Sequence, residues 1–213
     1  MLTYSMGEKT TRVGMEYLTI GREFEHHRGS MMMEPDEAFP PYAFVPGGPW
    51  PHPTRTPAGH SFLHKHDPKP EPIDPAHWED SREYLHGIRL FNGGYYWEAH
   101  EAWEGLWHAA GRRGPIADLL KALIKLAAAG VKVRERQSSG VATHAGRAAF
   151  LFQSIQTEIG PTFLGLNLRN LAEIATKLAA SPPKCDVDPA VRVHRVFEFE
   201  IRPISDIAAI DQS

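Results

Sequence analysis

The chain has 213 residues, of which 42% are hydrophobic and 23% are charged, and its formal net charge is −3 at pH 7. This balance is ordinary for a soluble globular protein and leaves room for one domain with a sizeable core. No basic excess points to a nucleic-acid partner, and no apolar run reaches the ~18 residues that a transmembrane helix needs.

The only cysteine of the chain, Cys185, excludes an internal disulfide, and we interpret it as an incidental thiol in a loop. A chain without disulfides is typical of a reducing compartment. The first 20 residues also lack the apolar core of a signal peptide. We therefore expect a cytoplasmic protein whose partners are neither nucleic acids nor membranes.

Proline content and periodicity divide the chain into four segments. Residues 1–34 have no clean periodicity, and we expect them either to be disordered or to lie upstream of the native start. Residues 35–74 hold most of the prolines, which exclude long helices, yet they are too aromatic for a free linker. They are predicted to form an arm that packs on the domain. Residues 75–181 are the predicted helical core, and residues 182–213 the predicted C-terminal strand and tail.

Hydrophobic periodicity predicts about five helices in the core. Asp74 and Pro75 are typical N-cap and first-turn residues for the first helix, and Asn92-Gly93-Gly94 tolerates the positive φ that ends it. The expected bounds are Pro75–Phe91, Tyr95–Ala110, Pro115 to near Ser138, Val141–Ile159 and Leu168–Ala180.

The period changes near the C-terminus, where apolar residues alternate over residues 191–201. Alternation of this kind predicts a β-strand with one apolar face, and a lone strand needs a partner. Residues 42–45 of the arm are the best candidate for that partner. The fold class expected is therefore mainly α, a compact array of about five helices with a proline-rich arm and a short strand that pairs with the arm.

The stretch FNGGYYWEAHEAWEGLW, residues 91–107, places histidine and glutamate among aromatic residues. On a helical wheel His100 lies within the apolar arc and Glu104 beside it, one turn away. Glu98 and Glu101 fall towards the polar side, so we expect them to be exposed unless the arm covers them. A buried carboxylate needs a partner, because its desolvation is otherwise too unfavourable.

Two kinds of partner satisfy Glu104 in this pattern. In the first, His100 and Glu104 bind one divalent metal ion together with His144 or His77 from another helix, and Glu101 is the general base. In the second, Lys121 or Lys125 pairs with Glu104, which gives a charge network without metal because a protonated lysine is not a ligand. His144 also fits the pattern of an ordinary core histidine.

The arm adds three histidines in AGHSFLHKH, namely His60, His64 and His66. Their loop context predicts surface side chains, but one of them could complete a site if the arm folds over the second helix. No Walker loop, dinucleotide-binding glycine motif or nucleophile elbow occurs, so we expect no nucleotide or organic cofactor.

The aromatic His-Glu stretch, followed by LLKALIKLAAA, resembles the all-helical family called domain of unknown function 309. The resemblance covers about residues 77–178 and implies a compact helical array with the His-Glu helix at its centre. Its members are often labelled predicted metal-dependent hydrolases. Lys121 and Val131 depart from the family pattern, which often has glutamine and sometimes histidine there. The matching positions are Phe91, Asn92, Gly94, Tyr96, Trp97, Glu98, His100, Glu101, Glu104 and Trp107.

Two hypotheses of function follow. The first is a metal-dependent hydrolase of an unknown small-molecule substrate, with His100, Glu104 and His144 as ligands and Glu101 as base. The second is a non-catalytic binding or scaffold domain that takes a protein partner and in which the His/Glu cluster fixes helix packing. Both are compatible with a homo-oligomer.

Overall fold

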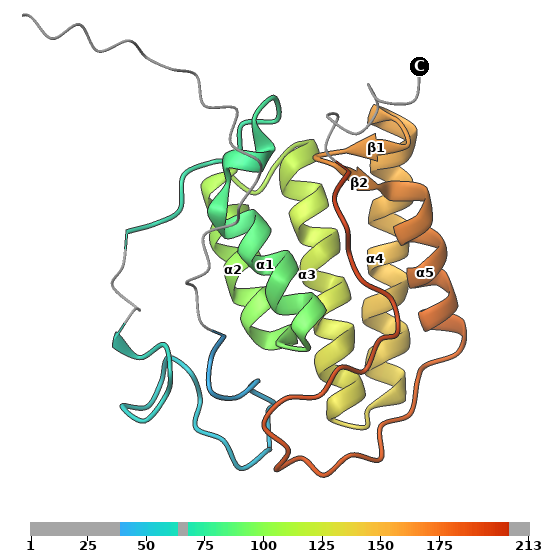
Figure 1. Cartoon of the computed structure of the whole chain (residues 1–213). Helices are drawn as coiled ribbons and strands as arrows, with labels where there is room; N and C mark the ends of the chain where they lie inside the picture. Colours follow the sequence, from blue (N-terminus) through green and yellow to red (C-terminus); the bar gives the residue numbers. More distant parts are fainter. Residues whose placement is uncertain (1–38, 64–67, 205–213) are drawn as a thin grey trace, which may run out of the picture. The chain divides into compact units, whose positions relative to one another are not determined.

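A computed structural model of the chain describes residues 39–63 and 68–204, so the predicted extension 1–34 lies outside the described residues. The described part is mainly α-helical, which confirms the predicted fold class (Figure 1). No helix within it has the length and apolar character needed to cross a membrane. A 3-10 helix, η2 (Trp78–Asp80), precedes α1 (Arg82–Gly93), α2 (Tyr96–Ala109), α3 (Pro115–Arg134), α4 (Ser138–Ile159) and α5 (Leu168–Ala180).

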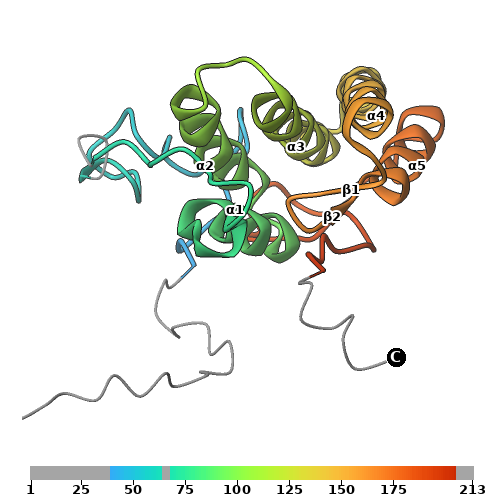
Figure 2. The ribbon, with the colours of Figure 1, turned by 90° about the horizontal axis from the view of Figure 1, so that it is seen from above.

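Each α-helix packs against the next one in chain order, as Figure 2 shows from above. A short antiparallel hairpin joins α4 to α5. Its strands are β1 (Thr162–Phe163) and β2 (Leu166–Asn167), with Thr162 opposite Asn167. Short connections of this kind make successive helices neighbours, which places α3 between α2 and α4 in the middle of the array.

Two helix starts follow local signals in the sequence. Pro115 opens α3 after Gly114, whose φ of 83° only glycine adopts readily. Asn167 caps α5 by accepting a hydrogen bond from the backbone N–H of Asn170 at 2.9 Å. The α5 bounds match the prediction, whereas α4 begins at Ser138, three residues before the expected Val141.

The first helix begins later than predicted. Asp74 was expected to cap a helix starting at Pro75, but its carboxylate accepts from the N–H of Ala76 and from the ring of His77, each at 2.9 Å. These bonds close a local turn instead of a helix. The α-helix starts only at Arg82, after η2.

The predicted C-terminal strand is wrong. Among the described residues, one backbone hydrogen bond links residues 191–201 to the arm, from Ala43 N–H to the Arg192 carbonyl at 2.8 Å. Helix side chains take the place of a partner strand: the Asn92 amide donates to and accepts from the backbone of Ile201, both at 2.8 Å. The Tyr96 hydroxyl accepts from Val196 N–H at 3.0 Å. The alternating pattern therefore marks an extended segment (Figure 1), whose backbone is hydrogen-bonded to side chains of α1 and α2.

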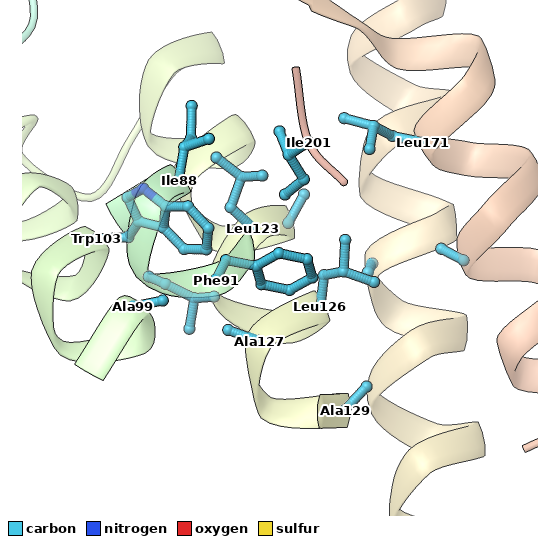
Figure 3. Packing of buried hydrophobic residues seen from close by; sticks show 14 of the residues in the cluster. Ile88, Phe91, Ala99, Trp103, Leu123, Leu126, Ala127, Ala129, Leu171 and Ile201 are labelled. Carbon is cyan, nitrogen blue, oxygen red and sulfur yellow. The ribbon is translucent and has the colours of Figure 1, made fainter. Parts of the chain in front are cut away.

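The core takes buried residues from all five described α-helices and from this C-terminal segment. Figure 3 shows Phe91, Leu123, Leu126 and Ile201 turned towards one space, and all four are buried. Two glycines let large rings approach the helix backbones closely. A Cβ atom on Gly87 would lie 2.3 Å from Nε1 of the fully buried Trp103, and one on Gly130 would lie 2.6 Å from the ring of Tyr96. Tight packing of this kind fixes α1 and α3 against α2.

Candidate functional site

Three polar side chains of α2 converge on its outer surface. His100, Glu101 and Glu104 each offer a ligand atom, and these atoms all lie within 4.8 Å of one another. His100 and Glu104 are half-buried, whereas Glu101 is exposed. The grouping follows from helix geometry, because residues one turn apart project to the same side.

The environment of His100 suits a metal ligand. Its ring stacks on Trp97 with centroids 5.9 Å apart, and its Nδ1 atom is buried without a hydrogen-bond partner in the described part of the chain. Nδ1 lies 3.6 Å from Oε1 of Glu101, which is too far for a good hydrogen bond. Two ligands each about 2.1 Å from a tetrahedral ion would be about 3.4 Å apart. The donor set therefore fits a divalent cation with small side-chain adjustments.

The charge-network hypothesis requires a lysine paired with Glu104, and the described part of the chain shows no such pair. Lys121 is exposed and Lys125 is half-buried, and no ion pair within the described ranges joins either of them to Glu104. The half-buried carboxylate of Glu104 thus meets His100 and Glu101 rather than an ammonium group.

His144 on α4 lies outside this group of three described side chains. It is half-buried, and its Nδ1 atom is also buried with no hydrogen-bond partner among the described residues. Burial lowers the pKa of His144, and the charges of Lys125, Lys132, Arg147 and His100 lower it further. A neutral imidazole is the form that binds metal, so the site of His144 favours the ligand form.

His77, the other histidine considered for the site, lies elsewhere. Its exposed ring bonds Asp74 at 2.9 Å, and this hydrogen bond raises the pKa of His77. It therefore belongs to the turn before η2.

The buried carboxylate of α2 is Glu98. The helical wheel predicted that Glu98 would be exposed unless the arm covered it. Glu98 is only 7% exposed, because the arm covers it. Its Oε1 atom accepts from the Phe44 N–H at 2.9 Å and from Nε2 of His60 at 3.1 Å. The arm therefore does fold over the second helix, which is the condition under which Glu98 was expected to be buried. His64 and His66 lie outside the described residues.

His52, which the sequence did not single out, lies in the arm between these two contacts. Its ring meets Trp97 edge-on with centroids 5.6 Å apart, next to the Trp97–His100 stack. Burial lowers the pKa of His52, Arg55 lowers it further, and the carboxylate of Glu101 opposes both effects. Only the fold of the arm reveals this neighbour, because no regular spacing connects His52 with α2.

The arm contacts described above and the His/Glu group all involve α2, the helix that carries the aromatic stretch. A comparison with curated proteins finds no match. Residues 84–143, which include α1 from Tyr84 onwards, α2, α3 and the start of α4, match the family model described as Domain of unknown function (DUF309). The match includes His100, Glu101 and Glu104 and supports the family resemblance over a narrower range than the expected residues 77–178.

Proposed function

We propose that the chain is a metal-dependent hydrolase of a small-molecule substrate, in which His100 and Glu104 bind one divalent ion and Glu101 is the general base. The observation that carries the proposal is the convergence of the three side chains, whose ligand atoms lie within 4.8 Å of one another. The buried Nδ1 atom of His100, which lacks a hydrogen bond among the described residues, supports it.

The surroundings of each side chain favour its role in the proposed site. Trp97 stacks on the His100 ring and limits its rotation, which holds the imidazole in place for binding. Two carboxylates beside one imidazole give the cluster a charge that a divalent cation balances. Glu101 is the exposed member, so its carboxylate can reach a water molecule and accept its proton. A bound ion would supply Lewis-acid activation of that water and of the substrate.

A ligand from a second helix would complete the set, and His144 is the candidate. Its Nδ1 atom has no hydrogen-bond partner in the described ranges and its pKa is lowered, and both observations favour a neutral, available imidazole. The charge of His100 is the smallest of the contributions that lower this pKa.

The alternative is a non-catalytic binding or scaffold domain. One observation favours it: the three converging side chains all come from α2, and exposed acidic groups commonly gather without an ion. Under this alternative the cluster binds no metal, and the arm contacts at Glu98 are the functional polar network of α2.

Elemental analysis of the purified protein tests the proposal. We expect a stoichiometric divalent metal in the wild type, its loss in His100→Ala and Glu104→Gln, and its retention in the control His77→Ala. Glu101→Gln should retain the ion yet lose hydrolysis of a panel of chromogenic esters. A metal-free wild type, or a His100→Ala variant that keeps its metal, would refute the proposal and favour the scaffold.

A further inference from the structure

A basic hollow lies at the C-terminal end of α2. Its volume is about 790 Å³. Among the described residues that line it, three are cationic, one is histidine and none is a carboxylate. The lining consists of Lys69, Pro70, Gly105, His108, Gly111, Arg112 and Arg113.

The arm and the end of α2 form the walls of this hollow together. Pro70 packs on Gly105, where an added Cβ would lie 3.3 Å from the proline ring. Beyond the helix end, Gly111 and Arg112 adopt φ values of 71° and 63°. For arginine this left-handed conformation is unfavourable, and such residues often occur at ligand-binding sites.

Arg112 is held with its terminal nitrogens available. Its Nε–H donates to Nδ1 of His108 at 2.9 Å, and its guanidinium lies over the ring of Trp107 at 5.4 Å. No acceptor for its two Nη groups occurs within the described ranges. Because arginine Nε is always a donor, Nδ1 of His108 accepts, and the proton of a neutral His108 ring is on Nε2. The hollow therefore offers hydrogen-bond donors, namely the Nη groups of Arg112 and the Nε2–H of a neutral His108 ring.

The hollow adjoins the candidate metal centre on the same face of α2. Gly105 follows Glu104 directly, and His108 lies seven residues after Glu101. Seven residues are close to two helical turns, so the two side chains project in nearly the same direction, about 10.5 Å apart along the axis. A small molecule of ordinary size can therefore reach from one to the other.

We propose that this hollow binds a phosphate group of the substrate, so that the substrate class is a phosphorylated small molecule whose reacting bond lies at His100, Glu101 and Glu104. The assignment to a substrate rests on the proposed hydrolase function. A guanidinium matches the geometry of phosphate oxygens and donates charge-assisted hydrogen bonds to them. The phosphate is then a binding handle remote from the reaction, and its binding energy positions the reacting bond.

Titration calorimetry of the metal-free full chain tests this proposal with inorganic phosphate as the probe and acetate at equal ionic strength as the comparison anion. The test variant is Arg112→Gln/Arg113→Gln. The control, Arg169→Gln/Lys177→Gln, removes the same charge from exposed positions on α5. We expect the test variant to lose at least about tenfold in phosphate affinity, as loss of one strong contact would produce, and the control to change less than about twofold.

A second variant protects against a folding artefact. Lys69→Gln changes the arm side of the hollow and leaves the turn after α2 intact, so it should also weaken phosphate binding if the site is as described. Equal affinity in test and control variants, acetate binding as tight as phosphate, or no saturable phosphate binding would each overturn the proposal.

The outcomes separate the two proposals. Phosphate binding that depends on Arg112 and Arg113 in a protein that binds no metal would retain the anion site and remove the hydrolase. Metal binding at His100 without such phosphate binding would retain the metal site of the proposed hydrolase and remove the anion site.

Discussion

Glu98 on α2 and His60 in the arm form a buried pair, with Nε2 of His60 3.1 Å from Oε1 of Glu98 and both side chains 6% exposed. The same oxygen accepts the N–H of Phe44. One carboxylate thus holds two points of the arm that are 16 residues apart in the sequence. His52 lies midway between those points and rests on Trp97.

Removing this carboxylate should release the arm. Glu98→Ala leaves the Phe44 N–H and the His60 ring without their acceptor, so we expect a loss of about 1–3 kcal/mol in the free energy of unfolding. Urea denaturation measures the loss, and limited proteolysis should cut residues 44–63 faster. The control is Glu101→Gln, an exposed change expected to stay within about 0.5 kcal/mol. Equal stability of both variants would contradict the role assigned to Glu98.

Close packing of Gly87 against Trp103 predicts a second loss of stability. A Cβ atom would lie 2.3 Å from Trp103 Nε1, and the ring is fully buried, so Gly87→Ala should destabilise by about 1–3 kcal/mol or more through overpacking. Gly146 on α4 is the matched control, because its nearest neighbour would be 3.9 Å away. There alanine should be neutral or stabilise by about 0.5–1 kcal/mol. Thermal unfolding of the two variants should therefore shift in opposite directions or differ clearly.

The Asn92 amide should hold the C-terminal segment in place. Asn92→Asp keeps the acceptor for Ile201 N–H but replaces the donor to the Ile201 carbonyl with an oxygen. We expect a loss of about 1–3 kcal/mol and faster hydrogen exchange at Ile201. Unchanged exchange at that amide would show that apolar packing of the segment suffices.

Acid should destabilise the protein through His144. Burial and nearby cations lower the pKa of folded His144 below its ordinary 6.5, so the folded state favours the neutral ring. This contribution to stability is complete above about pH 6.5 and is lost as the pH falls through the lower folded pKa. The charged groups that lower the pKa of His144 are Lys125, Lys132, Arg147 and His100.

Melting curves between pH 5 and pH 8 test that sign. The variant His144→Asn cannot take up the proton, so its melting temperature should fall less than that of the wild type on acidification. An identical slope in both proteins would mean that His144 does not contribute.

The stability of a Glu104→Gln variant shows whether Glu104 is a metal ligand or a structural group. Since no lysine pairs with it among the described residues, Glu104→Gln should change the unfolding free energy by less than about 0.5 kcal/mol in metal-free buffer. The wild type alone should gain stability on addition of Mn²⁺ or Zn²⁺, because a ligand that binds only the folded state stabilises it. A large loss in metal-free buffer would instead indicate a structural role.

Much of the helical core could be predicted because its signals are local. Pro115 and Asn167 set helix starts by chemistry confined to neighbouring residues, and the predicted bounds of α5 hold. The Asp74 signal failed since its carboxylate closes a turn with His77 before any helix begins. Alternation over residues 191–201 identified the inward-facing Phe197 and Ile201 but not their partners, which are helix side chains.

The sequence by itself determined the mainly α fold and the grouping of His100, Glu101 and Glu104, because one helix carries all three and its geometry alone brings them together. Tertiary structure decided the burial of Glu98, the place of His52 beside Trp97 and the basic hollow beside Gly105. Each of these depends on contacts between the arm and α2, which lie tens of residues apart. No periodic pattern along the chain records such contacts; packing of the folded arm creates them.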